Sequence, residues 1–157
     1  MSAPDLRPVH RWPLRVYFED TDAGGMAYHA SYLRWAERAR TEALRAIDLP
    51  HQRMMDEHDA LLVVRRAELE YFRPARLDDP LVVETRTHAL RGVTLDLDQR
   101  FLLDGEAAEG LPEAARLLAT ARIGLACVDR HSLRPKRIPE PWRTALGTIG
   151  PAGGAGE

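Results

Sequence analysis

The apolar and polar positions of the chain change period along its length, from strand-like to helical and back again. Residues 12–18 (WPLRVYF) are rich in side chains that favour strands, and residues 19–25 (EDTDAGG) have the composition of a turn. From residue 29 to 47, apolar side chains recur every three or four positions, which predicts one long amphipathic helix ending before Pro50. Its apolar stripe consists of Tyr32, Ala36, Ala39, Ala43 and Ile47, widened by Leu33, Trp35 and Leu44.

Strand patterns dominate the rest of the chain. A short polar helix is expected at 51–58, followed by strands at 60–72, 80–90, 93–103 and 117–128. The second and third of these strands alternate apolar and polar side chains, and Arg91-Gly92 between them suits a hairpin turn. Because short turns permit antiparallel but not parallel pairing, the pattern predicts an α+β fold: one antiparallel sheet of about five strands with a long helix packed on it.

Both ends of the chain lack this periodicity. We expect a disordered segment at 1–10, a single domain at 11–143 and a flexible Gly/Pro/Ala tail at 144–157. Residues 104–116 have the composition of a mobile loop between two strands. The N-terminus has no secretory signal and no run of about 18 apolar residues occurs, so we expect a cytoplasmic protein without a membrane span.

The composition of the chain argues against several classes of function. The net charge of −2 gives no reason to expect a nucleic-acid partner. Cys127, the only cysteine, excludes an intrachain disulfide, and its place in the apolar run 123–128 favours a buried structural thiol. His51 and His58 lack a standard zinc-binding spacing, and no Walker or dinucleotide-binding glycine loop is present. We therefore expect neither a metal nor another cofactor.

Candidate chemistry gathers between the first strand and the long helix. Glu19, Asp20 and Asp22 precede Tyr28-His29, and Asp22 lies on a turn followed by glycines. Backbone N–H groups at a helix start are unpaired and partly positive, so they can stabilise an oxyanion while a nearby carboxylate acts as general base or nucleophile. The same residues also suit an ordinary turn and helix cap, and local composition leaves both interpretations open.

Two longer motifs separate these interpretations. Residues 15–45 contain D-T-D-A-x-G-x-x-Y-H-x-x-Y followed by E-R-A-R, and residues 70–79 together with Arg91-Gly92 supply further matching positions. Over about residues 11–140 this pattern resembles the 4-hydroxybenzoyl-CoA-thioesterase-like hotdog enzymes, and among them the Tol-Pal-associated acyl-CoA thioesterases of bacteria. The resemblance implies a hotdog fold, in which a curved antiparallel sheet wraps a long helix, and hydrolysis of acyl-CoA. It also implies a homodimer or homotetramer with its sites at subunit interfaces.

The resemblance further assigns roles to individual residues. It makes Asp22 the catalytic carboxylate, as general base or nucleophile. His29 is expected to line the same site, with its backbone N–H at the thioester oxygen, and Tyr28 to pack beside it. Phe18 is a departure, because many relatives have tyrosine there and one hydroxyl near the site is missing.

Substrate-binding residues are assigned in the same way. Glu37 matches an acid two turns along the helix, and an ion pair with Arg38 or Arg40 is its alternative role. Arg91 and Thr94 are candidates for binding the CoA phosphates, and an exposed hairpin arginine is the alternative. Two other functions stay open: an acyl-carrier-protein thioesterase, and a non-catalytic acyl-CoA-binding or envelope-associated interaction protein.

Overall fold

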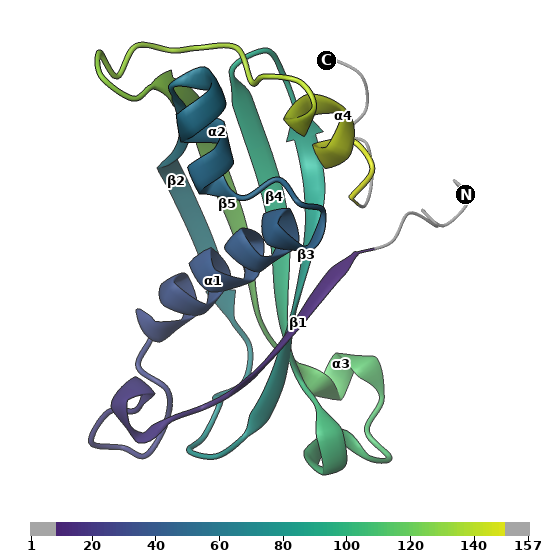
Figure 1. The fold of residues 1–157 in the computed structure, drawn as a ribbon. Coiled ribbons are helices and arrows are strands. Elements are labelled where there is room, and N and C mark those ends of the chain that lie inside the picture. Colours follow the sequence, from purple (N-terminus) through teal and green to yellow (C-terminus); the bar gives the residue numbers. More distant parts are fainter. Residues whose placement is uncertain (1–8, 150–157) are drawn as a thin grey trace.

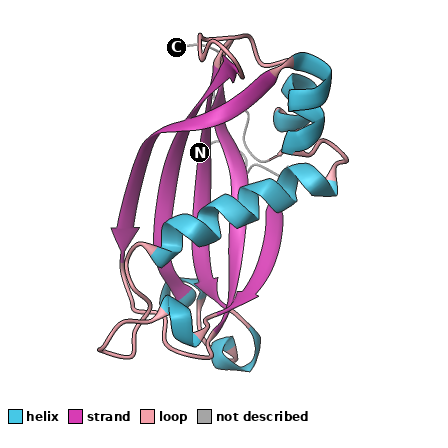
Figure 2. Cartoon of the chain, turned by 60° about the vertical axis from the view of Figure 1, so that its left-hand side comes forward, coloured by secondary structure: helices cyan, strands magenta, loops and turns pink. Residues whose placement is uncertain are grey.

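The computed structural model describes residues 9–149 and contains one five-stranded antiparallel sheet in the order β1-β3-β4-β5-β2. The strands are β1 (His10–Arg15), β2 (Ala60–Tyr71), β3 (Pro80–Leu90), β4 (Thr94–Leu103) and β5 (Leu117–Asp129). The helices are η1 (Phe18–Asp20), α1 (Ser31–Ala46), α2 (His51–His58), η2 (Gly105–Ala108), α3 (Glu113–Arg116) and α4 (Trp142–Leu146). The long helix α1 crosses one face of the sheet (Figures 1 and 2). The predicted α+β hotdog arrangement is confirmed.

Strand β4 shows why the sheet has one apolar face. Its buried side chains alternate with Asp96, Asp98 and Arg100, which point to the other face. On the helix side, the fully buried Gln99 donates a hydrogen bond from Nε2 to the carbonyl oxygen of Ala36 in α1, at 2.9 Å. On the opposite side, Arg122 pairs with Asp98 at 2.8 Å. The helix therefore covers the apolar face, and ion pairs cover the outer face.

Most of the predicted stripe of α1 is buried, including Trp35, Ala36 and Ala39. Two of the predicted positions are wrong, because Leu33 is 42% exposed and Ile47 is 37% exposed. Ile47 follows the last helical residue as the cap, and Leu33 is not among the buried residues of α1. Small alanines on the buried side allow α1 to approach the strands closely.

The ends of two predicted elements move by a few residues. The first strand ends at Arg15 rather than Phe18, because the Tyr17 N–H donates to the Asp20 carboxylate at 2.8 Å and begins the short helix η1. The long helix begins at Ser31 rather than His29. The predicted mobile loop at 104–116 contains η2 and α3. No helix of residues 9–149 has the length and apolar character needed to cross a bilayer.

The C-terminal boundary also differs from the expected one. Leu146 and Ile149 are buried against the sheet, although the sequence places both in a flexible tail. The Thr87 hydroxyl donates to the Leu146 carbonyl oxygen, and the Thr87 N–H donates to that of Ile149, each at 2.7 Å. Two isolated apolar residues therefore anchor a segment whose composition has no periodicity. At the other end, His10 belongs to β1; residues 1–8 and 150–157 of the expected loose segments lie outside the described residues.

Candidate active site

Residues 16–30 lie beside the connection between β2 and β3, at the lower end of the molecule in Figure 1. Val16 exchanges two backbone hydrogen bonds with this connection: its N–H donates to Asp79 and its carbonyl oxygen accepts from Asp78, both at 3.0 Å. Further along, the Ala27 N–H donates to the Ala75 carbonyl oxygen at 2.8 Å. The residues predicted to carry the chemistry are thus held on a loop that is fastened at both ends.

Asp22 lies at the exposed tip of this loop. Its Oδ1 accepts the Gly24 N–H at 2.9 Å, and its own N–H donates to the Met26 carbonyl oxygen at 2.9 Å. Within residues 9–149, no hydrogen bond uses the second carboxylate oxygen, Oδ2. The carboxylate borders a shallow hollow that is also lined by Phe18 and Leu77. One oxygen therefore shapes the turn, while the other has no hydrogen-bond donor among residues 9–149.

The turn before α1 carries the second part of the predicted site. Because the helix begins at Ser31, with Ala30 as its cap residue, His29 precedes the helix instead of starting it. The Tyr28 N–H donates to Asp20 at 2.7 Å, and the Ser31 N–H donates to Tyr28 at 2.9 Å. Across the described part of the chain, no backbone hydrogen bond uses the N–H of His29 or Ala30. These two N–H groups lie at the partly positive end of α1, where a negatively charged oxygen is stabilised.

Tyr28 and His29 lie side by side, with ring centroids 4.3 Å apart and planes tilted by 50°. Both side chains are exposed, and His29 borders a second hollow together with Met26 and Tyr71. No hydrogen bond or ion pair between described residues joins Asp22 to His29. Residues 9–149 hold no group of three metal-ligating side chains.

Tyr71 is a candidate site residue to which the sequence analysis assigned no role. Its hydroxyl, at the end of β2, donates to the carbonyl oxygen of His29 at 2.8 Å. Its ring meets that of Tyr32 edge-on, with centroids 5.1 Å apart. Burial raises the pKa of Tyr71, so its hydroxyl stays protonated and able to donate. The available signal was its place in the second matching motif, which carried no role.

Glu37 lies further along α1, on its exposed side. Its Oε1 accepts the Thr41 hydroxyl at 3.0 Å, and no ion pair within 4.0 Å joins it to Arg38 or Arg40 in the described chain. Six residues separate it from Ser31, which is roughly 9 Å along a helix. Within one chain, Glu37 is therefore separate from the turn at His29.

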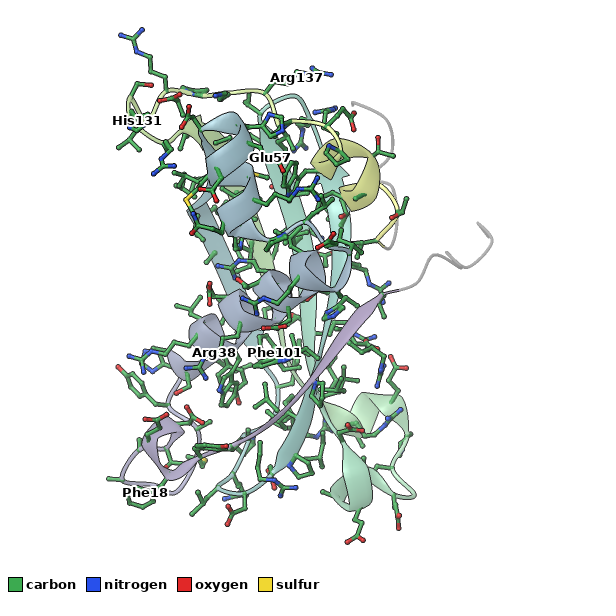
Figure 3. The ribbon with its side chains drawn as sticks, viewed as in Figure 1. Phe18, Arg38, Glu57, Phe101, His131 and Arg137 are labelled. Atoms are coloured by element: carbon green, nitrogen blue, oxygen red, sulfur yellow. The ribbon has the colours of Figure 1, made fainter. Side chains whose placement is uncertain are left out.

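Arg91 and Thr94 lie at the far end of the sheet. The Arg91 N–H donates to the Thr94 carbonyl oxygen at 2.9 Å, and its guanidinium pairs with Asp96 at 3.1 Å. The 11 residues of β3 separate this hairpin from the end that carries Asp22, a length of roughly 35 Å. In Figure 3, Phe18 marks one end and Arg137, which approaches the hairpin glycine, marks the other. One chain thus brings Tyr28 and His29 together but places Arg91 and Thr94 far from them.

Comparison with known families identifies the superfamily of this chain. The sequence profile of the thioesterase-like superfamily matches residues 16–146, which include both motifs and all five predicted strands except part of the first. The chain belongs to the thioesterase-like superfamily.

Named members of the superfamily match over most of their length. The acyl-CoA thioester hydrolase YbgC of Escherichia coli O6:H1 is 45% identical over 132 residues, 84% of this chain and 91% of the relative. The acyl-CoA thioesterase YbgC of Haemophilus influenzae is 37% identical over 135 residues, 86% and 92% of the two chains. Among solved structures, the 1,4-dihydroxy-2-naphthoyl-CoA thioesterase Slr0204 of Synechocystis superposes with a TM-score of 0.76 at 25% identity, covering 88% of this chain and 95% of its own.

Proposed function

We propose that this protein is an acyl-CoA thioesterase, which hydrolyses an acyl-CoA thioester to a free acid and CoA. The observation that carries the proposal is that, within residues 9–149, the N–H groups of His29 and Ala30 and the Oδ2 of Asp22 have no hydrogen-bond partner and lie on the same fastened loop. A thioester carbonyl needs such donors, because its oxygen becomes negative when the carbon is attacked. The activities named for the YbgC relatives support the same substrate class.

In the first route, Asp22 activates the water that attacks the thioester. As a general base, its Oδ2 takes a proton from water while the water oxygen bonds to the thioester carbon. The carbonyl oxygen becomes an oxyanion at the N–H groups of His29 and Ala30. When the carbon–sulfur bond breaks, the proton passes from Asp22 to the sulfur, which leaves as the CoA thiol.

Direct attack by Asp22 is the second route to the same products. Its carboxylate then expels the CoA thiolate and forms a mixed anhydride, which water cleaves to the acid and free Asp22. The two routes differ in oxygen transfer: after one turnover in ¹⁸O-water, only the anhydride route can leave ¹⁸O in Asp22. In either route, the rings of Tyr28 and His29 border the acyl thioester.

The CoA-binding residues come from a second copy of the chain. Arg91 and Thr94 are candidates for the CoA phosphates, and roughly 35 Å of β3 separates them from Asp22 within one chain. A two-fold axis relates opposite ends of two copies, so it can bring the hairpin of one copy to the loop of the other. Glu37, about 9 Å along α1 from Ser31, is included in the same proposal as a candidate substrate-binding residue.

Strand β2 supports such a dimer. It forms an edge of the sheet, and Val64, Tyr71 and Phe72 are each about half exposed on or beside it. Exposed apolar edges of this kind pair with another chain. Antiparallel pairing of two copies of β2 places the Tyr71 end of one beside the Ala60 end of the other, which is the end that carries Arg91.

A thioester carried on a protein is the second substrate class. Exposed arginines surround the loop and the start of α1, at Arg15, Arg34, Arg38, Arg73 and Arg76. Such a surface complements an acidic carrier protein, so acyl carrier protein is included as a candidate partner. A cytoplasmic location belongs to the same proposal and is tested by cell fractionation.

The test is release of CoA, followed with a thiol reagent, over short, long and aromatic acyl-CoAs. The comparison is wild type against Asp22→Asn, which retains the turn but removes the base or nucleophile. Asp78→Asn is the matched control, because Asp78 is an exposed aspartate in the neighbouring connection, at φ 70, which asparagine also tolerates. We expect turnover in wild type and Asp78→Asn, and a loss of about 10²–10⁴-fold in Asp22→Asn.

Other outcomes separate the alternatives. Turnover of carrier-protein thioesters without turnover of any CoA ester assigns the second substrate class. Binding of acyl-CoA without hydrolysis by wild type assigns a binding protein and refutes the enzyme. Equal turnover by wild type and Asp22→Asn keeps the enzyme but removes Asp22 from the chemistry.

A further inference from the structure

The hydroxyl of Tyr71 makes a hydrogen bond beside the candidate oxyanion site. It donates to the carbonyl oxygen of His29 at 2.8 Å, across 42 positions of sequence. The carbonyl of His29 and the N–H of Ala30 belong to one planar peptide group. The orientation of that carbonyl therefore fixes the direction in which the Ala30 N–H points.

Among residues 9–149, Tyr71 is the only residue that makes a hydrogen bond to the His29–Ala30 peptide group. The Asp20 carbonyl oxygen accepts the Tyr28 N–H at 2.7 Å and the Ser31 hydroxyl at 2.9 Å, so it holds the residues on either side of the peptide. Between residues 9 and 149, no other hydrogen bond reaches the His29 carbonyl oxygen, and none uses the Ala30 N–H. Without the Tyr71 hydroxyl, the peptide can rotate between two fixed neighbours.

Tyr71 is itself anchored by ring contacts and by its strand. Its ring lies edge-on to that of Tyr32, which packs edge-on against Phe101 in the core, with centroids 5.3 Å apart. Its backbone belongs to β2, in register with Ala119 of β5. The Tyr71 hydroxyl therefore links the end of β2 to the turn that precedes α1.

We propose that Tyr71 is a positioning residue, which orients and polarises the His29–Ala30 peptide so that the Ala30 N–H joins that of His29 as a second oxyanion donor. The inference rests on the proposed thioesterase function. Donation to a carbonyl oxygen polarises the whole peptide and strengthens donation by its N–H. Tyr71 does not touch the reacting atoms, so its loss acts through the peptide on the transition state.

The experiment compares Tyr71→Phe with Thr87→Val. Each substitution removes one hydroxyl that donates to a backbone carbonyl oxygen, at 2.8 and 2.7 Å, but Thr87 lies near the other end of β3, against the C-terminal segment. In Tyr71→Phe we expect kcat to fall by about tenfold to a hundredfold, with KM within about twofold of wild type. In Thr87→Val we expect a lower melting temperature and an unchanged kcat.

A spectroscopic readout accompanies the kinetics. The ¹³C shift of the His29 carbonyl and the ¹⁵N shift of the Ala30 amide should move in Tyr71→Phe and stay constant in Thr87→Val. A kcat within about twofold of wild type, a change in KM alone, or an equal fall of kcat in both variants overturns the role of Tyr71. In those cases an active wild type leaves the proposed function standing, whereas an inactive wild type refutes both.

Discussion

Truncation of Leu146 tests whether the C-terminal segment belongs to the folded domain. Leu146 is 3% exposed and, with Ile149, borders a small apolar cavity beneath α1 that Leu44, Leu95 and Leu97 also line. Leu146→Ala removes the buried side chain and enlarges this cavity, which costs about 2–5 kcal/mol at such sites. Because a cavity already lies beside Leu146, its packing is incomplete, and we expect about 3 kcal/mol.

The expected loss is large enough to measure by thermal and urea unfolding. For a chain of this size, about 3 kcal/mol lowers the melting temperature by roughly 6–12 °C. Leu111→Ala is the matched control, because it truncates the same side chain at a position that is 41% exposed; it should change stability by less than about 1 kcal/mol. If Leu146→Ala melts within 1 °C of wild type, approximately as Leu111→Ala does, residues 144–149 do not pack as described.

Three further predictions concern other parts of the molecule. A Cβ at Gly24 would lie 3.2 Å from Oδ1 of Asp22, so Gly24→Ala should displace that carboxylate and lower kcat by about tenfold without unfolding the protein, as measured by CoA release and circular dichroism. Donation by the Ser132 and His131 N–H groups lowers the pKa of Asp129 from 3.8 to about 2. The contribution of Asp129 to folding is therefore complete above pH 4 and is lost as the pH falls from about 4 to 2. An NMR titration of the 129–134 turn should show the low pKa, and a carboxyl shift centred near pH 4 would contradict it. Burial raises the pKa of Cys127, so the folded protein should not react with a thiol reagent at pH 7. The denatured chain should expose one reactive thiol. Fast reaction of the folded protein would contradict the burial of Cys127.

Period and turn composition were sufficient to predict the central elements. The alternation of residues 80–90 and 93–103 predicts two strands with their apolar side chains on one face. The structure has strands at Pro80–Leu90 and Thr94–Leu103, within one residue of the predicted bounds. The helix was also predictable, because its small and aromatic side chains share one stripe. The errors are its two ends, where Ile47 follows the last turn and His29 precedes the first, and Leu33, which is exposed within the first turn.

The local pattern of apolar and polar residues could not predict contacts between segments that are distant in the sequence. Leu146 and Ile149 stand alone in a stretch rich in Gly and Pro, and their burial depends on the contact of this stretch with β3 at Thr87. The bond between Tyr71 and His29 requires β2 to end beside the turn before α1, which no spacing in the sequence reveals. The separation of Arg91 from Asp22 likewise follows from strand direction, and it agrees with the site between two subunits that the family resemblance implies.

The most direct test of the account is a single-turnover experiment, with enzyme in excess over one acyl-CoA that wild type hydrolyses. This measures the chemical step apart from binding and product release. We predict that Asp22→Asn binds the acyl-CoA with an affinity close to wild type but cleaves its thioester about 10²–10⁴-fold more slowly. Equal single-turnover rates for the two proteins would contradict the assignment of Asp22 as the catalytic carboxylate.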